Sequence, residues 1–291
     1  MASWLLVPAD KDKPVMGAAA AGADAVVLDL SRALPEIAQA KARETARDWL
    51  AAQQHQVLAS KRFQRWVKIS GLSSPHWQED LVQVLHGRPD GLMVADVSAH
   101  SELQEIAGAI YEIEQRCGVA HGATRLIPVL GSTPTAALTM HRFLDEMHPR
   151  VSGLAWDASA LARSVGARRT RCSRGVWTDL AGHVRAQLLL LGHARGLEVI
   201  ESPWREPRDD EGTARAAKAA RADGFTGMIA LHPNQVGPVA AAFAPSPEER
   251  AEAQDIVSSF AINPGADVLP VRGRRVDQAG LEKARRLLGA A

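Results

Sequence analysis

Short apolar runs alternate with longer amphipathic segments along most of the chain. Runs rich in valine, isoleucine and leucine lie at residues 3–8, 25–30, 65–70, 91–97, 125–131, 151–157, 197–202 and 227–233. Such nearly continuous apolar runs are typical of parallel strands that are buried on both faces. Because helix-length segments separate them, the pattern predicts an α/β fold, a TIM (β/α)8 barrel. A doubly wound open sheet is the alternative.

The segments between the runs have helical periodicity. Residues 101–116 carry an apolar stripe at a spacing of 3.6 residues, formed by Leu103, Ile106, Ala107, Ile110 and Ile113. Pro35 and Pro75 stand where the first turn of a following helix needs no amide donor. Glycines that suit a left-handed helix end precede several strands, namely Gly22, Gly118, Gly196 and Gly224.

The last part of the chain lies outside this eightfold pattern. After Pro264 the sequence DVLPVRGRRVD predicts a hairpin, and GLEKARRLL predicts a basic helix. We therefore expect a barrel over residues 1–262 and a C-terminal hairpin and helix extension over residues 263–291. The extension is expected to serve oligomer contacts.

Composition and charge indicate what kind of partner the protein binds. The 291 residues are 46% hydrophobic and 23% charged, with a formal net charge of +1, which allows a large core. Such a charge creates no overall field toward nucleic acid or an anionic membrane, and the apolar run near residues 188–192 is too short to span a bilayer. A small molecule is the expected partner, with no nucleic acid and no membrane.

The cysteines and the first residues indicate a compartment. Cys117 and Cys172 lie far apart, without CxxC spacing, which excludes a clustered zinc site and favours a reducing cytoplasm. The apolar start has no basic region before it and is interrupted by Asp10, so it does not predict a secretory signal. We expect a cytoplasmic protein.

Polar side chains gather at the predicted carboxyl ends of the strands, where TIM barrels carry their active sites. No nucleotide-binding fingerprint and no HExxH motif competes with them. Carboxylates together with cationic groups suit a polar substrate that bears a carboxylate. The candidates are Asp10, Lys11, Asp29, Ser31, Arg32, Lys68, Ser70, Asp96, Ser132, Asp157, Glu201, His232 and Asn234.

Several of these residues have a structural alternative. Asp29 ends a buried strand and either serves chemistry or caps the following loop. Lys68 faces the mouth or forms a rim salt bridge, depending on register. For His232 a structural hydrogen bond to backbone is the favoured interpretation, and Asp10 either serves the site or caps a helix that starts near Pro14.

A basic loop, RSVGARRTRCSRG at residues 163–175, follows the sixth run. On the functional face it could hold the phosphate groups of a large anionic ligand. The alternative is a solvated loop whose charge keeps the chain soluble. The RGRRVD segment near the end allows the same two interpretations.

Longer motifs resemble a known family. LLVPAD at the start resembles the LFVPGD of the HpcH/HpaI aldolase and citrate lyase beta-subunit family, and GADAVVLDL and GFTGMIALHPNQV resemble its second and eighth strands. VRGRRVD and the helix after it resemble its ending. The resemblance implies a TIM barrel, trimers or larger homo-oligomers, and carbon–carbon bond cleavage or formation on acyl thioesters or small oxo acids, assisted by Mg²⁺.

The chain departs from the family at the expected site. Ser31 and Arg32 replace two carboxylates of the family's LDLED, while Asp29 is kept. Lys68 stands where the family has an arginine, which keeps the charge but loses bidentate geometry. Ala95 and Asp96 replace a Pro-Lys pair.

Both family carboxylates that hold Mg²⁺ are also replaced. Gly131 aligns with the glutamate of a pattern like LIET, and Ala160 aligns with the aspartate of a pattern like FGxxDL. Since Mg²⁺ requires oxygen ligands, the inherited site is not expected to bind it. Asp96 and Asp157 appear nearby, and three interpretations stay open: a shifted metal site, an acid and base pair, or drift.

Two functions follow from the resemblance. The first is a citrate lyase beta-like carbon–carbon lyase acting on a coenzyme A thioester or small oxo acid. Its catalytic residues would be Asp29, Lys68 and Asp157, and its substrate-binding residues Asp10, Ser31, Arg32, Ser70, Asp96, Ser132 and His232. The alternative is a catalytically impaired member that binds a coenzyme A thioester or a partner subunit.

Overall fold

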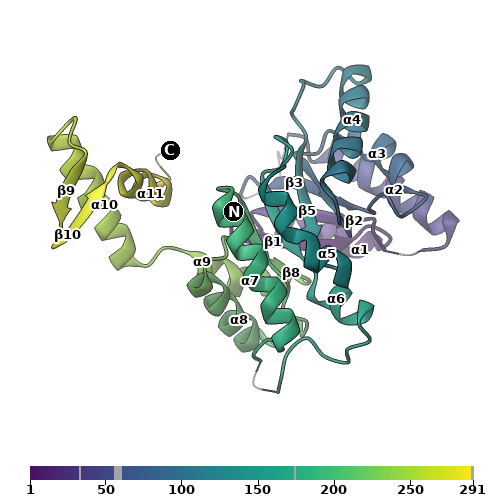
Figure 1. Cartoon of the computed structure of the whole chain (residues 1–291). Helices are drawn as coiled ribbons and strands as arrows, with labels where there is room; N and C mark the ends of the chain where they lie inside the picture. Colours follow the sequence, from purple (N-terminus) through teal and green to yellow (C-terminus); the bar gives the residue numbers. More distant parts are fainter. Residues whose placement is uncertain (33, 56–60, 174, 290–291) are drawn as a thin grey trace. The chain divides into compact units, whose positions relative to one another are not determined.

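A computed structural model describes all residues except 33, 56–60, 174, 290 and 291. Eight parallel strands close into a barrel because β1 pairs with both β2 and β8 (Figure 1). The TIM barrel expected from the alternation is confirmed. Its strands are β1 (Ser3–Pro8), β2 (Ala25–Asp29), β3 (Gln64–Ile69), β4 (Gly91–Val94), β5 (Arg125–Leu130), β6 (Gly153–Trp156), β7 (Glu198–Glu201) and β8 (Gly227–Ala230).

Helices follow the strands and surround the barrel (Figure 1). Gly22 and Gly224 close helical segments in the left-handed conformation, with φ of 73° and 109°, as the sequence predicted. The helical segments are α1 (Asp12–Gly17), η1 (Ala18–Ala21), α2 (Glu36–Ala52), α3 (Trp77–Leu85), α4 (His100–Arg116), α5 (Pro134–Thr139), η2 (Met140–Leu144), α6 (Ala158–Ser164), α7 (Asp179–Ala194), α8 (Asp210–Asp223) and α9 (Pro233–Phe243).

Alternate residues of each strand face opposite sides of the barrel wall. Val26 and Leu28 of β2 belong to the large core between the strands and the helices. Ala25 and Val27 belong to a second core inside the barrel, together with Trp66 of β3. Because strand side chains alternate with a period of two, Asp29 and Lys68 are expected to face the barrel interior.

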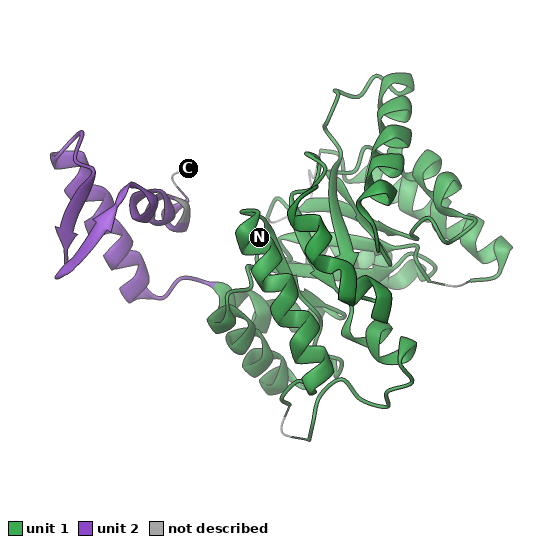
Figure 2. Ribbon diagram, viewed as in Figure 1, with its two compact units in different colours: residues 1–243 green, residues 244–291 purple. Residues whose placement is uncertain are grey.

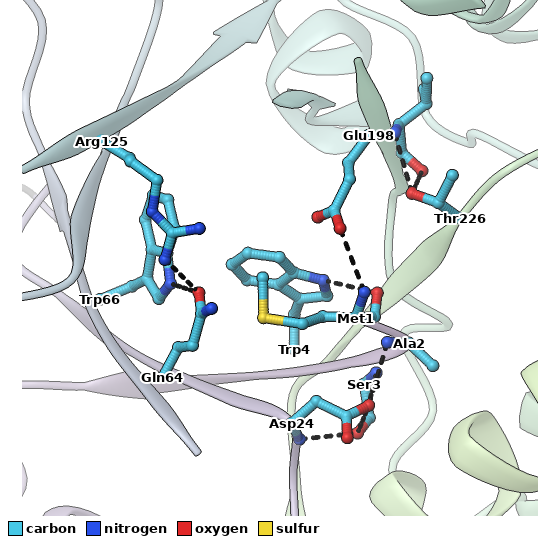
Figure 3. Close-up of polar contacts among 11 residues, drawn as sticks. Met1, Ala2, Ser3, Trp4, Asp24, Gln64, Trp66, Arg125, Glu198 and Thr226 are labelled. Atoms are coloured by element: carbon cyan, nitrogen blue, oxygen red, sulfur yellow. Dashed lines mark hydrogen bonds and ion pairs between the residues drawn. The ribbon is translucent and has the colours of Figure 1, made fainter. Parts of the chain in front are cut away.

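Two indole rings close the amino-terminal end of the barrel (Figure 3). Trp4 of β1 and Trp66 of β3 meet edge to face, with centroids 5.3 Å apart and planes at 66°. Gly91 leaves room for Trp66, because a Cβ at this position would lie 2.3 Å from ring atom Cζ3. The barrel interior is therefore a packed core rather than a pore.

Polar groups hold these rings in place (Figure 3). Gln64 Oε1 accepts hydrogen bonds from Trp66 Nε1 at 2.9 Å and from Arg125 Nη2 at 2.7 Å. The guanidinium carbon of Arg125 lies 5.2 Å from the Trp66 ring centroid. Trp4 Nε1 donates to the carbonyl of Met1 at 3.3 Å. The indole nitrogens of this end are thus satisfied.

Asp24 ties the first strand to the second at the same end. Its Oδ2 accepts hydrogen bonds from the backbone of Ala2 at 2.9 Å and of Ser3 at 3.0 Å, and Oδ1 pairs with Lys61. Burial alone would raise the pKa of Asp24, but the hydrogen bond and charge of Lys61 and the two N–H groups outweigh it. The pKa is lowered from 3.8 to about 2.

A buried ion pair joins α4 to the loop before β6. Arg150 Nη1 and Nη2 donate to Glu114 Oε1 at 2.9 Å and Oε2 at 2.6 Å, and both side chains are almost fully buried. The backbone of Thr124 donates to the same carboxylate at 2.9 Å. Although burial opposes it, this set of donors lowers the pKa of Glu114.

The chain divides into two compact units, Met1–Phe243 and Ala244–Ala291 (Figure 2). The second unit contains α10 (Pro247–Ile262), the antiparallel hairpin of β9 (Val268–Val271) and β10 (Arg274–Asp277), and α11 (Gln278–Leu288). The hairpin and the helix lie where the sequence predicted them. The division differs from the expected boundary at residue 262, because α10 is grouped with the extension rather than with the barrel.

The capping box at Ser246 explains why a new helix starts there. Ser246 Oγ accepts from the backbone of Glu249 at 3.1 Å, and Glu249 Oε2 accepts from the backbone of Ser246 at 2.6 Å.

Within the described residues, no helix is long and apolar enough to cross a bilayer.

Candidate active site

The carboxyl ends of three neighbouring strands are aligned by the sheet register. Pro8 of β1 is the register partner of Asp29 on β2, and Asp29 is the partner of Lys68 on β3. Asp29 follows inward-facing Val27 by two residues, and Lys68 follows inward-facing Trp66 by two. The strand period therefore directs both polar side chains into the mouth of the barrel, which answers the register question for Lys68.

A cavity of about 670 Å³ opens at this end of the barrel. Its base is apolar, formed by inward-facing residues of the strands, and its rim is polar and largely cationic. The polar residues that line it are Asp29, Ser31, Arg32, Lys68, Asp157, Ser159, Arg163 and Arg205, and the apolar ones include Met93, Val129, Trp156 and Ile229. This mouth cavity collects side chains from widely separated parts of the sequence.

Asp29 is oriented by Ser31. The carboxylate is 7% exposed, and its Oδ1 accepts hydrogen bonds from the Ser31 backbone at 3.0 Å and from the Ser31 hydroxyl at 2.7 Å. Within the described part of the chain, Oδ2 receives no hydrogen bond. One oxygen is thus fixed by the protein, while the other is available to a ligand in the mouth cavity.

Cationic groups outnumber carboxylates in the mouth cavity. Lys68 and Arg163 form no ion pair with any described residue, while Arg205 donates to the Ser159 hydroxyl. Arg32 pairs with Asp10 at 2.9 Å. The mouth cavity therefore suits an anion, since protein carboxylates neutralise only part of its positive charge.

Asp157 has a structural task in the same cavity. It is the N-cap of α6, and its Oδ1 accepts from the backbone of Ser159 at 2.8 Å and of Ala160 at 3.0 Å. Such a cap stabilises a helix start by about 1 kcal/mol. The predicted catalytic role of Asp157 stays a prediction, with one carboxylate oxygen already engaged.

A buried carboxylate supports the wall of the mouth cavity. Glu201, 1% exposed, accepts hydrogen bonds from Trp156 Nε1 at 2.8 Å and from Arg185 Nε at 2.5 Å. Burial raises the pKa of Glu201, and the charge of Arg185 opposes this. Glu201 itself does not line the mouth cavity; it holds the Trp156 ring that does.

The remaining sequence candidates lie around the mouth cavity rather than in it. Ser70 and Asp96 line an adjacent cavity of about 370 Å³, which shares Ser31 and Arg32 with the mouth. Asp10 does not cap a helix: α1 begins at Asp12, its N-cap is Lys11, and Asp10 pairs with Arg32 and Lys11 instead.

Ser132 and His232 are placed outside the mouth cavity. Ser132 is 2% exposed, and its hydroxyl has no hydrogen-bond partner in the described structure. His232 is exposed, and its Nδ1 accepts a hydrogen bond from the backbone of Asn234 at 3.3 Å. This contact matches the structural alternative for His232, while substrate binding by either residue stays a prediction.

Two cations of the mouth cavity were not selected from the sequence as site residues. Arg163 is the first residue of the basic loop and lies one helical turn after Ala160. Because it follows the sixth strand closely, the sequence could have indicated that it lies near the mouth. Arg205 lies in the loop after β7, which also faces the mouth in a TIM barrel. The sequence pattern pointed to the strand ends and to the basic loop 163–175 as a whole, but not to Arg163 or Arg205 individually.

The described residues do not fit the Mg²⁺ site implied by the resemblance. Gly131 has a φ of +70°, and a Cβ here would lie 2.6 Å from Val184 Cγ1 and 2.9 Å from Met140 Cε. Asp157 and Asp96 line different cavities. No group of three His, Cys, Asp or Glu side chains among the described residues could hold a metal ion. Hard cations require several oxygen ligands, so we assign no step to Mg²⁺.

The fold defines a TIM-barrel protein, and its mouth cavity is a candidate site for a small anionic ligand. The family model for HpcH/HpaI aldolase/citrate lyase matches residues 2–233, and the chain belongs to this family. The family recognised from the sequence motifs is thereby confirmed.

Relatives match over nearly the whole chain. A (3S)-malyl-CoA thioesterase from Cereibacter sphaeroides is 25% identical, covering 99% of this chain and 94% of its own. A citrate lyase subunit beta-like protein from Mycobacterium tuberculosis is 26% identical over the same shares. The crystal structure of CitE from M. tuberculosis with magnesium, acetoacetate and coenzyme A has a TM-score of 0.71 at 24% identity, covering 100% of this chain and 97% of that one. That last similarity supports the fold.

Proposed function

We propose that the protein is a citrate lyase beta-like carbon–carbon lyase that acts on an acyl-CoA thioester or a small oxo acid without the family's Mg²⁺. The observation that carries the proposal is the mouth cavity, where Lys68, Arg163 and Arg205 lie in one space with the oriented carboxylate of Asp29. The names of the relatives, a malyl-CoA thioesterase and a citrate lyase subunit beta-like protein, supply the substrate class.

The chemistry follows from the charges. When the bond between the α and β carbons of a β-hydroxy acyl thioester breaks, the β-hydroxyl gives up its proton and becomes a carbonyl. The electron pair of the broken bond passes through the α carbon to the thioester carbonyl oxygen and forms an enolate. Positive groups already fixed around that oxygen stabilise the developing charge, the task that a metal performs elsewhere. Lys68, Arg163 and Arg205 are suited to this task, and Arg32 to holding a substrate carboxylate.

Asp29 is suited to moving the proton. Its Oδ1 is held by Ser31, so Oδ2 is the oxygen available to accept a proton from a substrate hydroxyl or to return one to the enolate carbon. Such positioned acid–base groups contribute about 10²–10⁴-fold to a rate. The role of Asp29 as a catalytic residue is part of the proposal.

Binding without turnover is the second candidate function. It is favoured because Gly131 and Ala160, which the resemblance aligns with the family's metal ligands, carry no side-chain oxygen, and because Asp157 caps a helix. A protein of this kind would bind a coenzyme A thioester or a partner subunit through the same cationic mouth.

One experiment separates the two functions. The chain is treated with EDTA and assayed for cleavage of malyl-CoA, citramalyl-CoA and citryl-CoA, and its melting temperature is measured with acetyl-CoA and oxo acids. We expect cleavage of one thioester at a rate that added Mg²⁺ changes less than twofold. Thermal stabilisation without any cleavage supports the binding protein, because a ligand that binds only the folded state raises its stability.

Lys68→Met is the matched test of the site, with Lys41→Met as control. Lys41 pairs with Asp12 at 3.4 Å on the exposed surface, so its loss removes the same charge away from the mouth cavity. The Lys68 variant should lose thioester binding by about tenfold or more, the scale of one charge-assisted hydrogen bond. Cleavage that depends strictly on Mg²⁺ would contradict the metal-free proposal.

We also propose a cytoplasmic homo-oligomer, a trimer or larger, in which residues 263–291 contribute contacts. Cys117 and Cys172 form no disulfide among the described residues, which agrees with a reducing compartment. Light scattering on the full chain and on a chain shortened after residue 262 tests the assembly. If the shortened chain forms an assembly with the same number of subunits, residues 263–291 are not needed for oligomer contacts.

A further inference from the structure

A second cavity, of about 640 Å³, lies outside the mouth and shares no lining residue with it. The basic loop, the end of the β7–α8 connection and helices α7 and α8 contribute its walls. The side chains on which the inference rests are Arg171, Trp177, Arg185, Trp204, Asp209 and Arg215. We call it the tryptophan–arginine cavity.

Arg171 is the central cation of this cavity. Its guanidinium carbon lies 3.3 Å from the ring centroid of Trp177 and 5.4 Å from that of Trp204, and its Nη1 donates to the carbonyl of Gly175 at 2.8 Å. No carboxylate of the described residues lies within 4 Å of it. Burial lowers the pKa of Arg171 to about 10, so the group is half-buried yet charged at neutral pH.

The other two arginines of the cavity already form ion pairs. Arg185 pairs with Glu201 at 2.5 Å and with Asp223 at 2.9 Å, and Arg215 with Glu211 at 3.4 Å. A cation that is partly removed from water without a counter-ion is costly, and an anion from solution relieves that cost. Arg171 is thus the cation of this cavity that forms no ion pair with a described carboxylate, although the charge of Glu201 acts on it from beyond 4 Å.

Asp209 does not supply the missing counter-ion. Its Oδ1 accepts from the backbone of Gly212 at 2.7 Å as the N-cap of α8, and its Oδ2 accepts from Trp204 Nε1 at 3.1 Å. This hydrogen bond fixes the plane of the Trp204 indole beside the cavity. Gly212 leaves space for the ring, because a Cβ here would lie 2.8 Å from Trp204 Cε2.

We propose that the tryptophan–arginine cavity is a second ligand site, which binds a small organic anion that carries a flat, conjugated group. The carboxylate or phosphate of the ligand pairs with Arg171, and its flat group lies against the indole of Trp204. Aromatic pairs of this kind gain stability beyond the area they bury, and cations over indoles add to it. The volume admits a single substituted ring with its anionic group.

Binding is tested on the full chain with benzoate and phenyl phosphate, which share a ring and differ in the anion. Tryptophan fluorescence and melting temperature are followed, with cyclohexanecarboxylate as the ligand that lacks a flat ring. We expect saturable binding of benzoate or phenyl phosphate, and whichever of them binds identifies the anion. Binding of cyclohexanecarboxylate within twofold of benzoate would overturn the flat-group part, and no saturable binding would overturn the site.

Single-residue variants test in which of the two cavities the aromatic anion binds. Arg171→Met should weaken aromatic-anion binding at least tenfold, while Arg168→Met removes an exposed charge from the same loop and should leave binding unchanged. Lys68→Met, which alters the mouth cavity alone, should also leave it unchanged. Loss of binding in the Lys68 variant would put the anion in the mouth and overturn the proposal. A failed Lys68-dependent thioester assay, by contrast, bears only on the proposed lyase function.

A crystal of the unaltered chain soaked with 4-bromobenzoate gives an answer even if Arg171→Met does not fold. The anomalous signal of bromine should lie beside Trp204, within the tryptophan–arginine cavity. Bromine found only elsewhere would overturn the proposal.

Discussion

The Ser31 hydroxyl donates to Asp29 Oδ1 at 2.7 Å, so the residue two positions after Asp29 orients its carboxylate. The backbone of Ser31 donates to the same oxygen at 3.0 Å. Two donors on one oxygen direct the other toward the mouth cavity. Ser31 is therefore a positioning residue for Asp29.

Removing the negative charge of Asp29 should abolish proton transfer. In Asp29→Asn we expect cleavage to fall by about 10²–10⁴-fold, the usual contribution of an acid–base group. Ser31→Ala keeps the carboxylate and the backbone donor, so its loss should be nearer tenfold, the scale of one hydrogen bond to a charged group. Steady-state rates of both variants check the order, and equal losses would contradict it.

Introducing a glutamate at position 131, where the resemblance implies a metal ligand, should damage the fold instead of creating a metal site. Gly131→Glu requires an L-residue at φ +70° and a Cβ against Val184 and Met140. The free energy of unfolding of this variant should therefore be lower by at least about 2 kcal/mol. Ala160→Asp is the control, because an acid in the first turn of α6 is favourable. Urea unfolding measures both. A Gly131 variant of unchanged stability that is stabilised by Mg²⁺ would refute the prediction.

Breaking the buried pair of Glu114 and Arg150 should be strongly destabilising. Arg150→Met leaves a carboxylate that is 2% exposed without its cation, and such losses cost about 3–5 kcal/mol. Arg116→Met removes an exposed partner of Glu112 on the same helix and should cost less than about 0.5 kcal/mol. Chemical unfolding of the two variants tests the contrast.

Acid should weaken the amino-terminal end of the barrel through Asp24. Its pKa is about 2 when folded and 3.8 ordinarily, so its contribution is complete above pH 4 and disappears as pH falls toward 2. Since the group is partly exposed, we expect a loss of about 1–2 kcal/mol. Asp24→Asn should flatten this part of the curve of unfolding free energy against pH. An identical acid slope in the variant would refute the assignment.

The sequence predicted the barrel because each strand is nearly continuously apolar, a property that depends on burial on both faces. Asp29 and Lys68 were found for the same reason, since each interrupts an apolar strand at its carboxyl end. Lys68 and Trp66 share one face of β3, because they are two residues apart. A single sequence does not show whether that face points into the barrel or toward the helices.

Other features depended on the path of the loops. Arg163 and Arg205 reach the mouth from a helix and from a loop, where no period of two or 3.6 predicts direction. Asp157 was expected to act in chemistry, yet one of its oxygens caps α6, and only the local backbone reveals this. The grouping of α10 with the last residues likewise follows from packing that the apolar pattern does not specify.

The packed amino-terminal end of the barrel keeps water away from one side of the charged groups in the mouth. Beneath Asp29 and Lys68 lie packed apolar residues down to Trp4 and Trp66, so water screens the mouth charges from the open side alone. Field lines that cannot spread through the low-dielectric interior extend into the solvent above the opening. An anionic ligand is then attracted before it makes contact, and its association rate should fall steeply as ionic strength rises.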